Sequence, residues 1–207
     1  MINKLSLNIG HICKVEQVLG FGIRLVIWVA GCPFRCEGCI QPEYLLKNSG
    51  EDISLVKLLE IVNNHIGQID GITFSGGEPF WQADIISAFI DLLPSTLDKM
   101  VFTGYQVEEL NEKQIKCFSK FDLVVDGRYE KNQSGNYLWR GSSNQKFYSP
   151  SKKYDNQLLS SLYKSKTNGI SIKVTDDDLY FYGIPANNEI NFINTELINR
   201  GILTNSN

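Results

Sequence analysis

The sequence predicts an α/β protein built on a parallel sheet. Between Ile23 and Asp126, short apolar segments suited to buried strands alternate with segments of helical periodicity. Such alternation requires parallel strands joined by right-handed crossovers. At 207 residues, 43% of them hydrophobic, the chain is long enough to bury a core without disulfides. We expect a core domain at residues 1–150 and an extension at residues 151–207 that packs on it.

The order of apolar and polar residues places the individual elements of the core. Expected strands are 5–9 and 14–19, which we predict to pair, and then 23–30, 69–74, 99–103 and 121–126. Expected helices are one capped by Asp52 or Ser54, followed by 82–93 and 107–118. Ligand sites of parallel sheets lie at the carboxyl ends of the strands, so motifs that follow strands are the functional candidates.

The remainder of the chain has weaker signals. Residues 131–154 are polar and without clear period, which indicates a functional loop around Trp139–Gln145. Beyond it, residues 170–174 and 179–182 predict a β-hairpin around the acidic turn 176–178. A last helix is expected at 188–200, ended by Gly201. This extension is expected to pack on the edge of the sheet or to adjust the docking of a partner.

Three cysteines follow the strand at 23–30 with the spacing Cys32-x3-Cys36-x2-Cys39. A short loop with this spacing can place its thiolates around one inorganic core, and thiolates are the usual ligands of iron–sulfur clusters. Three thiolates leave one iron of a 4Fe-4S cluster open to a non-protein ligand, which is typical of a catalytic cluster. A zinc site is the alternative, with Cys13, Cys117 or a histidine as fourth ligand, and unliganded cysteines are another.

A second motif, Gly76-Gly77-Glu78, ends the strand at 69–74. Glycines allow the backbone to approach a ligand closely, and the adjacent carboxylate can accept a hydrogen bond from an amino group. A purely structural turn is the alternative. The segment Gly20-Phe21-Gly22 is not a dinucleotide-binding fingerprint, because the third glycine is missing and the segment precedes a strand.

Together these motifs carry a resemblance to a known family. The run Gly31–Glu43, with its three cysteines, resembles the cluster motif of the radical S-adenosylmethionine (radical SAM) superfamily. The blocks at 74–79, 102–105, 125–128 and 139–145 then follow in the order seen in its small activases of glycyl radical enzymes. This resemblance spans about residues 5–148 and implies an open, partial (βα) barrel of radical SAM type, with the hairpin and last helix as a C-terminal extension.

The resemblance also implies an activity. Cys32, Cys36 and Cys39 would hold a 4Fe-4S cluster whose open iron takes S-adenosyl-L-methionine. One-electron cleavage of that molecule would give a 5'-deoxyadenosyl radical, which installs a glycyl radical on a partner such as anaerobic ribonucleotide reductase. The electron would come from a flavodoxin- or ferredoxin-type donor. The chain would thus be an oxidoreductase, a radical SAM activase.

Individual roles are implied by the same resemblance. The backbone at Gly38, Cys39 and Ile40 would contact the adenine, and Gly76, Gly77 and Glu78 the amino group. Thr103 would lie beside the cofactor, while Asp126 and Arg128 would place a cation on its carboxylate. The Gly20–Gly22 turn would cover the cluster site, and Trp139–Gln145 would recognise a partner or close the loop. Gln41 stands where activases usually have Asn after the cluster motif, and this difference leaves the identity of the substrate undetermined.

Composition excludes some classes of function. A net charge of −3 gives no electrostatic argument for nucleic acid, and no apolar run approaches the roughly 20 residues that cross a bilayer. The amino terminus lacks the features of a signal peptide, and five cysteines are an odd number, so we expect a cytoplasmic protein without a disulfide framework. Two other hypotheses remain: a radical SAM enzyme acting on a small molecule or peptide, and a non-enzymatic zinc-binding or electron-transfer adaptor.

Overall fold

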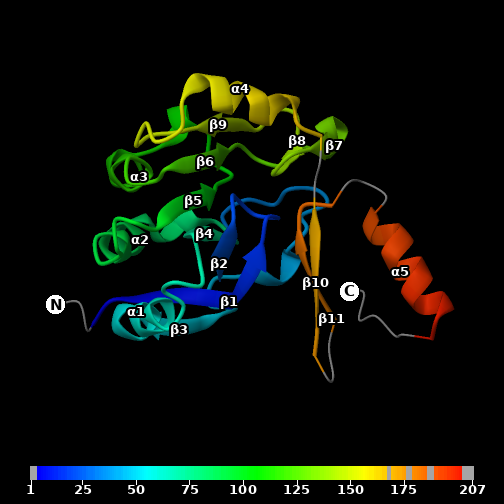
Figure 1. Ribbon diagram of the computed structural model, residues 1–207, viewed down its shortest axis with the longest axis horizontal. Helices are drawn as coiled ribbons and strands as arrows, with labels where there is room; N and C mark the ends of the chain where they lie inside the picture. The colour runs from blue at the N-terminus through cyan, green and yellow to red at the C-terminus, as the bar shows by residue number, and fades with distance from the viewer. Residues whose placement is uncertain (1–3, 167–168, 176–178, 186–188, 202–207) are drawn as a thin grey trace.

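A computed structural model describes residues 4–166, 169–175, 179–185 and 189–201. Its centre is a seven-stranded sheet of order β3-β1-β2-β4-β5-β6-β9 (Figure 1). The four middle strands run parallel and follow one another along the chain: β2 (Ile23–Val29), β4 (Gly71–Gly76), β5 (Asp98–Phe102) and β6 (Leu123–Asp126). The sheet begins at β3 and ends at β9, so it is open. The predicted α/β class with a mostly parallel, unclosed sheet is therefore confirmed.

Antiparallel strands extend the sheet on both sides. β1 (Ser6–Glu16) pairs with β2 and with β3 (Glu51–Ser54), and β9 (Lys146–Tyr148) pairs with β6. The prediction that residues 5–9 and 14–19 pair with each other is wrong, because they belong largely to the same strand. Gly10 permits this continuity: the register shifts between Ile9 and His11, and the ring of Tyr44 lies where a Cβ of residue 10 would be.

Three helices cover the outer face of the sheet: α1 (Leu55–Asn63), α2 (Ala83–Ile90) and α3 (Glu112–Phe118). The N-cap of α1 is Ser54, whose hydroxyl accepts a hydrogen bond from the amide of Lys57. The helix predicted at 107–118 is divided into a 3₁₀ turn, Val107–Glu109, and α3. Asn111 separates them because its side chain accepts hydrogen bonds from two amides of the following turn and so starts a new helix.

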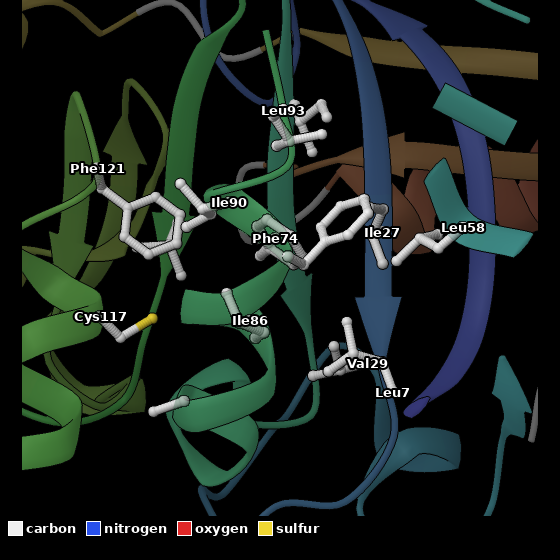
Figure 2. Packing of buried hydrophobic residues seen from close by; sticks show 14 of the residues in the cluster. Leu7, Ile27, Val29, Leu58, Phe74, Ile86, Ile90, Leu93, Cys117 and Phe121 are labelled. Atoms are coloured by element: carbon white, nitrogen blue, oxygen red, sulfur yellow. The ribbon is translucent and has the colours of Figure 1, made fainter. Parts of the chain in front are cut away.

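The main core lies between these helices and the outward-facing residues of the strands. Phe74 of β4 is fully buried and meets Phe121 edge to face (Figure 2). The ring of Phe74 also meets that of Phe89 of α2 edge to face. Ile86 and Cys117 lie in the same layer, and both are fully buried. Burial of this kind is worth about 2 kcal/mol for each large apolar side chain. Because side chains along a strand point alternately to the two faces of the sheet, the residues between these core residues point to the inner face.

The inner face carries two smaller apolar clusters. One contains Met100, Leu123, Val125, Trp139, Phe147 and Leu162, and Leu162 comes from α4 (Asn156–Lys164), a helix that the sequence pattern did not reveal. The segment 131–154 is not a loop throughout. It forms the small strands β7 (Ser134–Tyr137) and β8 (Arg140–Ser142) and then joins the main sheet as β9.

The second inner cluster brings in the predicted hairpin, β10 (Ile170–Val174) and β11 (Leu179–Gly183). Tyr182 packs there against Cys13 and Trp28. The predicted acidic turn 176–178 lies outside the described residues, as does residue 188, the expected start of the last helix. That helix, α5 (Glu189–Asn199), is drawn beside the hairpin at the edge of the molecule (Figure 1).

Buried charges tie the start of the extension to the core. Arg24 of β2 is fully buried and donates to Asp98 at 2.6 Å and to Thr73 at 2.9 Å. The other carboxylate oxygen of Asp98 accepts hydrogen bonds from Lys153 at 2.8 Å and Tyr154 at 2.7 Å. Residues just beyond position 150 thus contact the core directly, and the domain division at that position stays a prediction.

Candidate active site

The loop that holds the three cysteines leaves the carboxyl end of β2 and borders a cavity of about 600 Å³. Cys32, Cys36 and Cys39 all line this cavity, whose size is ordinary for a cofactor site. Cys117 is packed in the main core instead, and Cys13 in the inner cluster that contains Trp28. The structure thus brings together the three predicted ligands and separates them from the other two thiols.

Backbone hydrogen bonds fix the start of this cysteine loop. The amide of Gly31 donates to the carbonyl of Tyr44 at 2.9 Å, and the amide of Cys32 donates to that of Leu45 at 3.1 Å. The amide of Glu78 in turn donates to the carbonyl of Gly31 at 2.8 Å. Gly31 itself has a φ of +91°, a conformation that glycine adopts without strain. The cysteine loop and the Gly76–Glu78 turn are therefore held as one unit.

Phe34 fastens the far side of the cysteine loop. Its ring meets Tyr105 edge to face at 4.8 Å, and the guanidinium of Arg128 lies over it at 4.3 Å. Gly104 makes room for this ring, because a Cβ there would come within 2.7 Å of it. An exposed ion pair between Glu37 and Lys131 adds a second link, at 2.6 Å. The loop thus bridges the ends of β2, β5 and β6.

The predicted glycine turn has the close packing that its sequence suggests. A Cβ on Gly77 would come within 2.7 Å of the carbonyl oxygen of Tyr44 and would also strike the carbonyl of Gly31. Gly76 has a φ of +100°. Both glycines line the cavity. The turn therefore needs glycines in order to pack closely against the backbone of β2 and of the cysteine loop, and its contact with a cofactor stays a prediction.

Glu78 is 1% exposed and accepts three hydrogen bonds. One carboxylate oxygen accepts from the amide of Phe80 at 2.8 Å and the hydroxyl of Thr103 at 2.7 Å, and the other accepts from the amide of Gly104 at 2.7 Å. Burial raises the pKa of Glu78 to about 7 despite these three donors. A carboxylate has about four acceptor positions, so one remains, on the oxygen that Gly104 contacts.

Thr103 follows β5 and is buried beside this carboxylate. Both Thr103 and Gly104 line the cavity. The prediction that Thr103 lies beside a cofactor stays a prediction, and the structure shows which groups its side chain contacts. Its hydroxyl donates a hydrogen bond to Glu78 and accepts one from the backbone amide of Tyr105 at 3.2 Å. Thr103 therefore links the ends of β4 and β5.

Asp126 and Arg128 have different surroundings, although they are two residues apart. Arg128 borders the cavity, and both of its terminal nitrogens donate to one oxygen of Glu109 at 2.9 Å. Asp126 is 1% exposed and does not line the cavity. Its oxygens accept from the amides of Val107 at 3.0 Å and Lys146 at 3.3 Å. The structure therefore brings Arg128, but not Asp126, to the site, and Asp126 holds the backbone around it.

The segment Trp139–Gln145 turns inward. Trp139 is 4% exposed and meets Phe21 edge to face, and the guanidinium of Arg140 lies over the Tyr163 ring at 4.7 Å. These two side chains are thus not an exposed anchor for a partner, and that part of the prediction is wrong. The side-chain amides of Asn144 and Gln145 donate to the backbone carbonyls of Arg128 and Gly127, respectively, both at 2.8 Å. The segment closes the loop after β6, which was the other expectation.

The residues predicted to contact an adenine also lie on the cavity. Gly38, Cys39 and Ile40 all line it, and Gly38 has a φ of +76°. The following Gln41, Pro42 and Glu43 belong to the same wall. Burial raises the pKa of the Cys32 thiol to about 11 and also raises that of Cys39. Binding of a metal cluster would reverse this, because it favours the thiolates.

The Gly20–Gly22 turn does not cover the cysteine loop. It precedes β2, whereas the cysteine loop follows that strand, so the length of β2 separates the two. Gly20 packs against Met100 and Arg24, and Gly22 against Asp70 at the start of β4. Only the preceding Leu19 reaches the cavity among the described residues of this segment. The predicted covering role is therefore wrong.

Sequence reasoning missed the inner wall of the cavity. Trp28 and Phe102 line it from β2 and β5, and residues 181–185 of the hairpin complete it. Trp28 stands between Ile27 and Val29 in an apolar run, so only strict alternation along the strand could have assigned it to the inner face. The hairpin is remote in sequence and carried no signal of its own for this position.

Among the residues that the structure describes, no helix is both long and apolar enough for a membrane span. No group of three His, Cys, Asp or Glu side chains among these residues is close enough to hold a single metal ion.

Comparison with known proteins agrees with a set of three cysteine donors. The family described as the 4Fe-4S single cluster domain matches residues 18–148. The anaerobic ribonucleoside-triphosphate reductase-activating protein of Enterobacteria phage T4 is 31% identical over 150 residues, which are 69% of this chain and 94% of that protein. The protein of the same description from Escherichia coli K12 is 29% identical over 67% of this chain and 96% of its own length.

A more distant relative is the pyruvate formate-lyase-activating enzyme of Streptococcus mutans, 31% identical over 62% of this chain and 52% of its own. Among solved structures, QueE from Escherichia coli gives a TM-score of 0.45 at 12% identity, covering 60% of this chain and 72% of that one. The phage and bacterial activating proteins are matched over nearly their whole length, yet about a third of the present chain lies outside the match.

Proposed function

This chain belongs to the 4Fe-4S single cluster domain family, in the group of radical SAM activases, and we propose that it installs a glycyl radical on a partner enzyme. The partner would be an anaerobic ribonucleotide reductase, as the names of the phage and bacterial relatives suggest. One observation carries the proposal: the three cysteines of one loop border the same cavity as the Gly76–Glu78 turn.

In this proposal Cys32, Cys36 and Cys39 hold a 4Fe-4S cluster that S-adenosyl-L-methionine completes. When bound, the pair supplies a one-electron reductive cleavage that gives a 5'-deoxyadenosyl radical able to abstract hydrogen. The chain contributes position and exclusion of water. Three thiolates would leave one iron for a ligand with an amine and a carboxylate, and the hydrogen bonds that fix the cysteine loop would hold the three thiolates at the cavity.

Glu78 is the proposed acceptor for the amino group of S-adenosyl-L-methionine. Three of its four acceptor positions are used, and the fourth lies on the oxygen that Gly104 contacts. An ammonium at that position would keep Glu78 ionised, offsetting the burial that raises its pKa. The three existing donors would hold the carboxylate still while it binds.

Arg128 is the proposed partner of the cofactor carboxylate. Its guanidinium has five N–H donors in a planar fork, and Glu109 occupies two of its nitrogens. The ring of Phe34 supports the flat face of the group. The backbone at Gly38, Cys39 and Ile40 would then receive the adenine, and the Thr103 hydroxyl holds Glu78 by a hydrogen bond.

A one-electron donor of flavodoxin or ferredoxin type is the proposed reductant, because the cleavage consumes a single electron. Ile40 and Leu46, which flank the end of the cysteine loop, are 52% and 67% exposed and offer an apolar approach to it. We place the reaction in the cytoplasm, since all five cysteines are free thiols.

The test is anaerobic reconstitution with iron and sulfide, followed by dithionite and S-adenosyl-L-methionine, with chromatography for 5'-deoxyadenosine. The partner reductase is then added, and its glycyl radical is measured by electron paramagnetic resonance. Cleavage together with a partner radical would support the proposal. Cleavage without a partner radical would shift the assignment to another substrate.

A second candidate is a radical SAM enzyme for a small molecule, and the hairpin favours it because residues 181–185 give the cavity an additional wall. Cleavage strongly stimulated by a metabolite, in the absence of any protein partner, would select this candidate.

A further inference from the structure

The C-terminal hairpin lies beyond the part of the chain that the family match covers. That match ends at residue 148, and the hairpin strands occupy Ile170–Val174 and Leu179–Gly183. Five consecutive residues of the second strand and its end nevertheless line the cavity, from Phe181 to Pro185. The cavity of this chain is therefore built partly from residues that have no counterpart in the matched region.

Tyr182 is the centre of this contact. It is 7% exposed although it belongs to a two-stranded sheet at the periphery of the fold. Its ring lies 5.3 Å from that of Trp28, which also lines the cavity. Its hydroxyl is 2.9 Å from Nε2 of His11 on β1, and the two rings are stacked at 5.8 Å. Tyr180 stacks on the same histidine.

The hairpin is fastened to the core by side chains. Its strands form a sheet separate from the seven-stranded one, and the described backbone hydrogen bonds between elements include none that joins the two. The described side-chain hydrogen bonds from these strands to the core include the His11–Tyr182 bond and a long contact between Lys173 and Cys13, at 3.9 Å. A two-stranded hairpin has little stability of its own, so its side-chain contacts with the core determine its position.

We infer that the hairpin is a movable wall of the cofactor cavity. The contact between His11 and Tyr182, called the latch below, holds this wall against the core. Tyr182 is thereby a positioning residue that keeps cofactor cleavage coupled to the intended hydrogen donor. With the wall in place, water and small solutes have less access to the reacting atoms. With the wall displaced, the cavity opens on the side of β1 and β2. This inference rests on the proposed function, since the ligand of the cavity is taken to be S-adenosyl-L-methionine.

The first experiment measures amide hydrogen exchange in the cluster-loaded full-length protein, with and without S-adenosylhomocysteine, which binds without being cleaved. We expect the ligand to slow exchange both at residues 75–78 and at residues 179–185. Slowing at 75–78 alone would overturn the inference and leave the proposed function intact. If exchange slowed at neither segment, the ligand would not bind in this cavity, and both the proposed function and the inference would be contradicted.

The second experiment uses two variants of the latch in the same protein. Tyr182→Phe keeps the ring and removes the hydroxyl, and His11→Ala removes its partner, so each should speed exchange at residues 179–185 about fivefold, the effect of one hydrogen bond. The double variant should exchange little faster than Tyr182→Phe. Ile172→Ala is the matched control, because this hairpin side chain is 54% exposed and does not line the cavity.

The third measurement is the amount of 5'-deoxyadenosine formed for each glycyl radical on the partner. Tyr182→Ala should raise this ratio severalfold while leaving iron content unchanged, and Tyr182→Phe should restore most of the coupling. Ile172→Ala should match the wild type. A ratio in Tyr182→Ala equal to that of the wild type would show that the hairpin is only structural.

Discussion

Gly77 offers a direct test of how the site is assembled. A Cβ at this position would overlap the carbonyl groups of Gly31 and Tyr44, which are backbone atoms and cannot rotate away. We expect Gly77→Ala to cost about 1–3 kcal/mol in steric overlap. Displacing the turn would also weaken the hydrogen bonds from Gly77 to Val29 and from Glu78 to Gly31, each worth about 1 kcal/mol.

If the overlap costs about 2 kcal/mol and each of the two hydrogen bonds loses about half of its strength, the total is about 3 kcal/mol. For a chain of this length that corresponds to a drop in melting temperature of about 6–12 °C. Calorimetry of the cluster-free protein measures it, and iron content after reconstitution should fall because the cysteine loop moves with the turn. Gly67→Ala is the matched control: Gly67 has a φ of +82° with nothing within 4 Å, so it tests backbone strain alone. Gly77→Ala within about 0.5 kcal/mol of the wild type, with normal iron, would refute the reasoning.

The other predictions concern buried charges and thiols. The pKa of Glu78 is raised to about 7, so the folded protein binds a proton that the unfolded chain has lost, and without ligand its unfolding free energy should fall by about 3 kcal/mol as pH rises from 4.5 to 7. Denaturant unfolding should show this slope in the wild type and a much flatter profile in Glu78→Gln. Arg24→Met should destabilise by about 3–5 kcal/mol because it leaves Asp98 buried without its main partner. Lys153→Met, which removes a half-exposed partner of the same carboxylate, should cost about 1 kcal/mol or less, and equal effects would contradict this assignment. Cys117→Ala should lower stability by about 1–2 kcal/mol without changing iron content, whereas Cys36→Ala should lose iron; a loss of iron in Cys117→Ala would contradict the structural role of that thiol.

Local sequence was sufficient where one segment determines its own structure. The parallel strands and the cysteine loop follow from a simple alternation of apolar runs with turns. Ser54 caps its helix as the sequence indicated, because the cap depends on residues within one turn. The Gly76–Glu78 turn was recognisable for the same reason.

Long-range packing limited the remaining predictions. Residues 5–9 and 14–19 were expected to be two paired strands, yet one strand runs through Gly10 because Tyr44, about 30 residues away, occupies the space that this glycine leaves. Tryptophan is a residue type common at interfaces, but the ring of Phe21, which is distant in sequence, packs edge to face against Trp139.

The roles of Asp126 and Arg128 could not be separated by sequence position. Their difference depends on the partners that approach each of them in space, namely two backbone amides for Asp126 and Glu109 for Arg128. The hairpin wall was hidden for a similar reason. Nothing near Tyr182 in sequence indicates that His11 and Trp28 lie beside it.

The most direct test of the account is the glycyl radical itself. Reconstituted protein, S-adenosyl-L-methionine, dithionite and the anaerobic reductase are mixed without oxygen, and the reductase is examined by electron paramagnetic resonance beside a Cys36→Ala control. The account predicts a glycyl radical on the reductase with the wild-type chain and none with the variant. A fully loaded cluster that cleaves S-adenosyl-L-methionine yet leaves the reductase without a radical would contradict it.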